Sequence, residues 1–236
     1  MTGVMTLIGS QIIVKLVGLI YKVYLTNKEG FGDTGNAIYN GGYQIYELLL
    51  LLSSIGIPNA ISKLISEKIS VGDYKGADRI FKVALGLLSV IGTIGGLILF
   101  FGADFIATEM LNIPESAITL KILSPAILLV VISSVIRGYF NGRNQMKATA
   151  RSQALEQILK TLGTIIIVEI VAHVTSNNVV SMAAGATFAT TLSIIGSTIY
   201  ITKYYRDKKL TKKEISETKI HNPESTKHII KRILTI

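Results

Sequence analysis

Long apolar runs alternate with short charged segments along the whole chain. No Lys, Arg, Asp or Glu occurs from Val83 to Ala103 or from Ile170 to Thr202. A helix needs about 20 mostly apolar residues to cross a hydrocarbon core of about 30 Å. The pattern therefore predicts an all-α fold, a polytopic membrane helix bundle with about six transmembrane helices. The predicted spans cover residues 4–25, 40–62, 82–103, 118–140, 150–172 and 178–202.

The connections between these spans alternate in charge. Segments 63–82 and 137–151 hold five and four Lys or Arg residues, whereas 104–117 and 173–177 hold none. In the loop 26–39 one lysine faces two acidic residues. Because basic loops stay on the cytoplasmic side, both termini are predicted to be cytoplasmic, as an even number of spans also requires.

Residues 203–236 differ in composition from the six-helix unit of residues 1–202. Ten of the 24 basic residues lie after Thr202, which predicts a basic cytoplasmic linker. Apolar residues return at Ile229 and Ile230, and the sequence stops at Ile236 as a further helix begins. We therefore expect the sequence to be truncated within a longer chain.

Composition excludes several classes of function. The mean hydropathy is +0.50 and the net charge is +9. Basic residues gathered in loops and tail fit an anionic membrane surface, so we expect no nucleic-acid partner. The chain has no Cys and three scattered His, which predicts no metal site, and we expect no cofactor. The loops hold no nucleophile or acidic catalytic cluster, so we expect no enzyme.

Polar residues inside the first predicted span share one face. Gln11, Lys15, Gly18 and Lys22 are spaced 4, 3 and 4 residues apart, which places them together on a helix. A charge at mid-bilayer costs roughly 2.5–3.5 kcal/mol, so these lysines need partners or a wet cavity. Glu47 in the second span is the acidic candidate, either as the partner of Lys15 or as a site for a coupling cation.

The fifth predicted span repeats this spacing. Gln153, Gln157, Lys160 and Thr164 are again 4, 3 and 4 residues apart, and Glu156 lies one turn before Lys160. Lysines and arginines around a cavity suit an anion such as a phosphate or pyrophosphate. We call the predicted substrate-binding set the cationic seam; it comprises Lys15, Lys22, Glu47, Arg137, Gln153, Gln157 and Lys160. For Arg137 a simple positive-inside anchor is an equal alternative.

Two further features of the second span carry predictions. Gly56 and Pro58 predict a kink, because proline removes a backbone donor and crowds the preceding turn. The kink is either a hinge or a bend that fits neighbouring helices. The tyrosines at the start of this span and just before it, Tyr39, Tyr43 and Tyr46, are typical of a membrane-interface belt.

Four stretches carry a family resemblance: residues 42–47, 53–63, 137–142 and 152–157. They resemble the stage V sporulation protein B family, in the polysaccharide-biosynthesis branch of the multidrug/oligosaccharidyl-lipid/polysaccharide exporter superfamily. The resemblance implies one lobe of a two-lobe transporter, the other lobe being C-terminal and missing here. It further implies a lipid-linked sugar pyrophosphate as cargo, flipped across the bacterial cytoplasmic membrane by alternating access. Lys15 matches a basic residue of the family's cavity, whereas a second cavity arginine falls at Tyr21, so that assignment fails, although Lys22 is adjacent.

Three functions remain open from the sequence. The leading one is a flippase for a lipid-linked oligosaccharide or peptidoglycan precursor. A cation-coupled multidrug exporter is the second, although the excess of lysine over acid within the spans argues against it. An inactive transporter fragment or membrane scaffold is the third.

Overall fold

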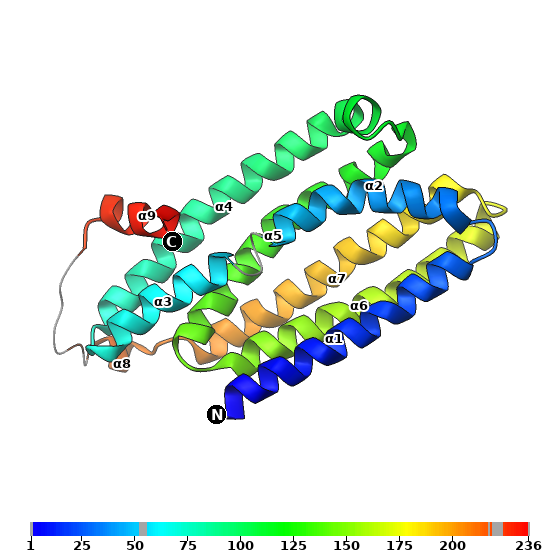
Figure 1. The fold of residues 1–236 in the computed structure, drawn as a ribbon. Helices are drawn as coiled ribbons and strands as arrows, with labels where there is room; N and C mark the ends of the chain where they lie inside the picture. Colours follow the sequence, from blue (N-terminus) through cyan, green and yellow to red (C-terminus); the bar gives the residue numbers. More distant parts are fainter. Residues whose placement is uncertain (1, 52–55, 217, 219–223, 236) are drawn as a thin grey trace.

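A computed structural model gives the fold for residues 2–51, 56–216, 218 and 224–235 (Figure 1). All regular secondary structure in these ranges is helical, as the sequence predicts. The elements are α1 (Thr2–Asn27), α2 (Gly32–Leu51), α3 (Ile57–Ser70), α4 (Tyr74–Phe105), a π-helix (Ile106–Met110), a 3₁₀ turn (Pro114–Ser116), α5 (Ala117–Gly142), α6 (Met146–Val174), α7 (Val179–Lys208), α8 (Lys212–Ser216) and α9 (Thr226–Thr235).

Five helical segments in the described ranges are long and apolar enough to cross a membrane. They are Ile8–Asn27, Tyr74–Met110, Pro114–Gly142, Met146–Val174 and Val179–Lys208, and they correspond to five of the six predicted spans. The predicted span 40–62 includes residues 52–55, which lie outside the described residues. Helices α2 and α3 flank that gap.

The predicted loops are too long, because the helices continue past the apolar segments. Most of 26–39 and 63–82 is helical, and only short turns separate α1 from α2 and α3 from α4. A helix supplies its own backbone hydrogen bonds, so it can extend into the head-group layer with charged side chains in water. In the turn between α3 and α4, Gly72 has φ +76°, a conformation that favours glycine. The Asp73 side chain accepts a hydrogen bond from the Gly76 N–H at 2.8 Å and so caps the start of α4.

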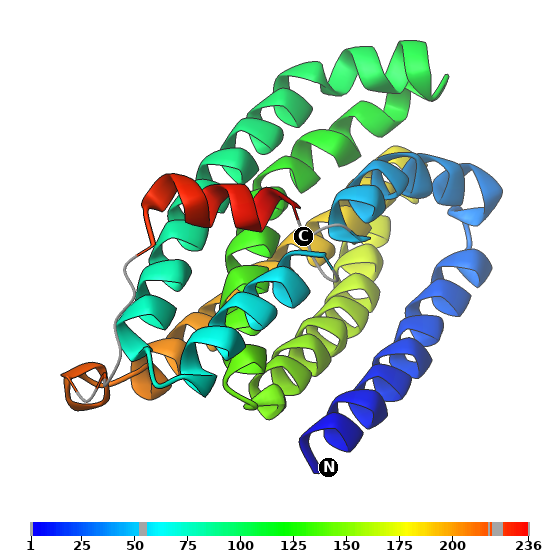
Figure 2. The same ribbon diagram turned by 60° about the vertical axis from the view of Figure 1, so that its left-hand side comes forward.

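Helices α5 and α7 form the interior of the bundle, and α1 and α4 lie at opposite edges (Figure 1, Figure 2). We compared the most apolar 18-residue stretch of each of these segments. In α5 and α7, 61 % and 56 % of that stretch is buried, whereas in α1 and α4 only 11 % and 22 % is buried. The exposed faces of α1 and α4 are rich in Ile, Leu, Val and Phe. Apolar surface of this extent is stable only against lipid or another apolar partner.

The ends of the bundle differ in charge. The α3–α4 turn, the α5–α6 turn and α8 lie at the end where the chain starts, and the α1–α2 and α6–α7 turns lie at the other end (Figure 1). The connections at the first end are the basic ones, so we call it the basic end.

Helix α3 packs against α5 with almost no space between the backbones. A Cβ atom on Gly138 would lie 2.9 Å from the Pro58 carbonyl oxygen, and one on Gly142 would lie 2.8 Å from the Ser62 carbonyl oxygen. Both contacts are with backbone, which cannot rotate away. Glycine at these two positions therefore allows the close approach that van der Waals packing in membranes favours.

We predict that Gly138→Ala and Gly142→Ala each lower the free energy of unfolding by about 1–3 kcal/mol, because the added methyl group overpacks the interface. The midpoint of thermal aggregation in detergent measures this. Gly86→Ala on α4 is the control, because a Cβ there meets nothing within 4 Å. Equal midpoints for the three variants would contradict the packing argument.

Helix α9 is fixed to the basic end by apolar and ionic contacts. Ile229 is buried in the cluster formed with α3 and α4. Lys68 Nζ lies 2.8 Å from Glu224, and Arg232 contacts both Glu224, at 3.2 Å, and Glu67. The hydrogen bond from Lys68 lowers the pKa of Glu224 below its ordinary value. The carboxylate is thus stabilised by the packing of α9.

We predict that Glu224→Gln loosens α9, seen as faster amide hydrogen exchange in residues 226–235. In the native chain the pKa of Glu224 is lower in the folded state than in the unfolded state. Its contribution to the stability of the folded chain is therefore fully present above the unfolded pKa of about 4.3. That contribution disappears as the pH falls through the folded pKa. Lys227→Gln, on the exposed side of α9, is the control. Unchanged exchange in Glu224→Gln would show that apolar burial alone holds the helix.

Candidate functional site

Lys160 is the most enclosed cation of the predicted cationic seam. Its side chain projects from α6 and the residue is only 5 % exposed. Its Nζ donates to the Tyr43 hydroxyl at 2.7 Å and lies 4.0 Å and 4.7 Å from the ring centroids of Tyr43 and Tyr21. Both distances suit cation–π attraction, which strengthens when the cation is desolvated.

Three tyrosines of α1 and α2 surround this ammonium group. Tyr39 stacks on Tyr43 with 5.4 Å between ring centroids, and Tyr21 completes the enclosure. We call Tyr21, Tyr39 and Tyr43 the tyrosine cage. The predicted interface belt is therefore wrong: Tyr39 and Tyr46 are each 2 % exposed and face the bundle interior, where they pack in apolar clusters with residues of the neighbouring helices.

The charge of Lys160 has no carboxylate in contact with it. None of the ion pairs formed within the described ranges includes Lys160. The hydroxyls of Tyr39 and of Thr164, which lies one turn along α6, are also buried. Neither hydroxyl forms a hydrogen bond with a described residue. An unneutralised cation beside spare hydroxyl donors favours an anion nearby.

Arg137 lies in a different cluster, where it is paired with a carboxylate. It is 4 % exposed, and its Nη2 donates to Glu156 at 2.6 Å, to Ser152 at 2.9 Å and to Ser197 at 3.0 Å. These partners come from α6 and α7, so the guanidinium joins three helices. A surface anchor does not match this geometry, since the Nε and Nη2 donors are used inside the protein; the binding of substrate by Arg137 stays a prediction.

The two glutamines of the seam lie in the contact between α1 and α6. Gln11 donates to Gln153 at 2.6 Å. The amide of Gln157 packs on Gly18, where a Cβ atom would meet its Nε2 at 3.0 Å. The polar face that the spacing predicts on each helix is thus the face by which α1 and α6 meet.

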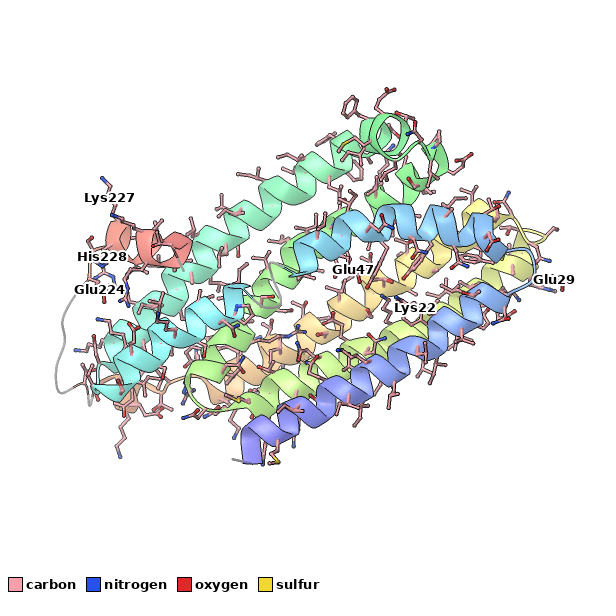
Figure 3. The ribbon with its side chains drawn as sticks, in the orientation of Figure 1. Lys22, Glu29, Glu47, Glu224, Lys227 and His228 are labelled. Atoms are coloured by element: carbon pink, nitrogen blue, oxygen red, sulfur yellow. The ribbon has the colours of Figure 1, made fainter. Side chains whose placement is uncertain are left out.

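Lys15 and Lys22 of α1 and Glu47 of α2 are exposed. Figure 3 shows Lys22 on α1 and Glu47 on α2 pointing into the space between the two helices. No ion pair of the described residues involves any of the three. The seam is therefore divided: Lys160 is enclosed, whereas Lys15 and Lys22 lie on open surface beside exposed aliphatic residues of α1.

The predicted hinge residues lie at the start of α3. Gly56 precedes the helix, and Pro58 is in its first turn, where the missing N–H breaks no hydrogen bond. Residues 52–55, which directly precede Gly56, lie outside the described residues, so the predicted kink and hinge stay a prediction. Pro58 itself packs on Gly138 of α5.

The tyrosine cage is the part of the site that the sequence analysis missed. Tyr39, Tyr43 and Tyr46 are spaced 4 and 3 residues apart, the same single-face pattern that identified the lysines. That spacing could have indicated that the three tyrosines share one helix face and point into the bundle. Tyrosines of an interface belt need no such regular spacing. No group of three or more metal-ligating side chains occurs in the described part of the chain.

Comparison with known proteins extends this picture. Residues 1–234 match the family described as "Polysaccharide biosynthesis protein". The chain is 28 % identical over 215 residues to the lipid II flippase MurJ of Bacillus subtilis, covering 88 % of this chain and 39 % of that protein. It is 28 % identical over 214 residues to the stage V sporulation protein B of the same organism, covering 89 % and 40 %. The chain thus spans about two fifths of the length of these curated relatives.

Solved transporter structures share the fold. The crystal structure of MATE in the straight conformation superposes with a TM-score of 0.79 at 18 % identity, over 98 % of this chain and 49 % of that one. A MOP superfamily transporter from Pyrococcus furiosus gives 0.71 at 18 % identity, over 99 % and 48 %. The chain belongs to the polysaccharide biosynthesis protein family, and it is a multi-pass helical membrane protein with the fold of one transporter lobe.

Proposed function

We propose that this chain is the N-terminal lobe of a flippase that moves a lipid-linked sugar pyrophosphate across the cytoplasmic membrane. The observation that carries the proposal is the uncompensated positive charge of Lys15, Lys22 and Lys160, which form no ion pair with any described carboxylate. Glu47 is the one acidic residue of the seam. The names of the relatives support the choice of cargo, since one is a lipid II flippase.

The proposed mechanism gives the lysines separate roles. Lys15 and Lys22 are exposed and take the pyrophosphate by charge-assisted hydrogen bonds. Lys160 is enclosed by the tyrosine cage and contributes a fixed positive potential behind them. The apolar tail of the cargo stays in the bilayer while the head group crosses between the lobes.

Alternating access requires this lobe to move against a C-terminal lobe. We propose that bending before Pro58, at or near Gly56, lets the α2 side of the site open and close while α3 stays packed on α5. We also infer that both termini are cytoplasmic, since the basic connections share one end of the bundle with the N-terminus.

We predict that Lys15→Gln and Lys22→Gln each slow flipping about 10- to 100-fold, because each loses a charge-assisted hydrogen bond of about 1.5–3 kcal/mol. The assay uses the full-length protein, with both lobes, in vesicles containing a labelled lipid-linked sugar pyrophosphate. Lys147→Gln, at the exposed start of α6, is the control. Full activity in both seam variants would overturn the proposal.

The same vesicles separate the flippase from a cation-coupled drug exporter. Organic cations that compete with transport, while lipid pyrophosphates do not, would favour the exporter. The exposed and unpaired Glu47 is the group that such a cation would meet. Glu47→Gln should leave flipping of the pyrophosphate cargo within about threefold, because the variant removes a repulsive charge.

Arg137 has a structural role in this proposal. We predict that Arg137→Met lowers stability by about 3–5 kcal/mol, because it leaves the carboxylate of Glu156 without its ionic partner. Arg137→Met combined with Glu156→Met should recover part of the loss, measured as the thermal midpoint in detergent. Lys15→Gln should leave this midpoint near the native value. An unchanged midpoint in Arg137→Met would instead return Arg137 to the substrate site.

A further inference from the structure

An open groove lies on the lipid-facing side of the bundle, away from the cationic seam. It has a volume of about 710 Å³ and is lined by residues of α4, α5 and α7. Its walls are apolar, with Leu97 and Phe100 on α4, Leu128 on α5 and Phe188 on α7. Helix α4 lies at the edge of the bundle opposite α1, so this groove faces the membrane (Figure 1, Figure 2).

Two glycines of α4 line the groove where α4 meets α5. A Cβ on Gly92 would lie 3.3 Å from the Leu128 Cα, and one on Gly96 would lie 2.9 Å from the Ser124 carbonyl oxygen, so the two backbones lie close together here. Pro125 interrupts the hydrogen-bond ladder of α5, since it has no N–H to offer the Lys121 carbonyl. The Ser124 hydroxyl donates to that carbonyl instead, at 2.8 Å. A polar backbone group in the groove wall is thereby satisfied without water.

The groove is nearly as long, measured along α4, as one leaflet is thick. Along α4 it extends from Gly92 to Phe100, eight residues or about 12 Å of helix. One leaflet of the hydrocarbon core is about 15 Å thick. Because α4 runs away from the basic end, the groove covers the half of the membrane opposite that end.

Both signs of charge lie where the groove meets the head groups. Lys121 lines its end, and Lys121 Nζ contacts the Asp104 carboxylate at 2.8 Å. Both side chains are exposed, at 38 % and 68 %. Glu109 and Glu115 follow in the same connection, which carries no basic residue of its own. The acidic surroundings repel anionic lipids, whereas the Lys–Asp pair complements a head group that carries one charge of each sign.

We propose that this groove binds a phosphatidylethanolamine molecule of the leaflet opposite the basic end. One acyl chain fills the space between α4, α5 and α7. The phosphate accepts a hydrogen bond from Lys121 Nζ, and the ammonium group donates to Asp104. Van der Waals packing of the chain against the apolar walls holds it in the groove, and the charge pair supplies the choice of head group.

Tryptophan fluorescence quenched by brominated lipid tests this site cleanly, because the chain contains no Trp. Leu97→Trp places the probe in the groove, and Ile98→Trp places it one residue along α4, outside the groove lining. The native side chains are 51 % and 65 % exposed, so both positions tolerate a large apolar group. Each variant of the full chain is reconstituted in phosphatidylcholine vesicles containing a small fraction of lipid with brominated acyl chains.

We expect brominated phosphatidylethanolamine to quench Leu97→Trp about threefold more effectively than brominated phosphatidylcholine, with no such difference for Ile98→Trp. Adding Lys121→Gln to Leu97→Trp should abolish the difference while the spectrum of the folded protein is retained. Equal quenching at the two positions by both lipids would overturn the site. A preference for brominated phosphatidylglycerol, or a preference that survives Lys121→Gln, would overturn the assignment of the head group.

Discussion

A charge inside a helical membrane bundle has no bulk water to solvate it, so each one must be matched by the protein or by a ligand. Arg137 meets this requirement internally, through Glu156 and two serine hydroxyls from the neighbouring helices. Lys160 meets it differently, through phenol rings and hydroxyls that keep the positive charge in place without cancelling it. The contrast divides the buried cations of this lobe into one that joins helices and one that maintains a positive potential.

That division organises the remaining polar groups. The glutamine contact between α1 and α6 and the packing of Gln157 on Gly18 hold the first helix against the wall that carries Lys160. Lys15 and Lys22 of the first helix are exposed, where a head group can reach them. An anion between the lobes would thus meet two accessible lysines with a third positive charge behind them. This arrangement agrees with a cargo whose head group is a pyrophosphate.

Glycine sets the distances on which these contacts depend. Gly138 and Gly142 allow α3 to lie against α5, which fixes the second half of the predicted second span. Gly92 and Gly96 act in the same way between α4 and α5, since a Cβ on Gly96 would lie 2.9 Å from the Ser124 carbonyl oxygen and one on Gly92 would lie 3.3 Å from the Leu128 Cα. Glycine thus allows two helices, α3 and α4, to approach the backbone of α5 closely.

The sequence by itself determined the helical class, five of the described spans and the alternation of basic and non-basic connections, because hydrocarbon thickness and loop charge act locally on each segment. It also placed Lys15, Lys22 and Lys160 at membrane depth. Only the tertiary structure decided which cation is enclosed: Tyr21 and Tyr43 reach Lys160 from helices more than a hundred residues away in the chain. Likewise the partners of Arg137 on α6 and α7 follow from helix packing. Hydropathy gives the depth of a residue in the membrane, but the neighbour that it meets depends on how the helices rotate and pack.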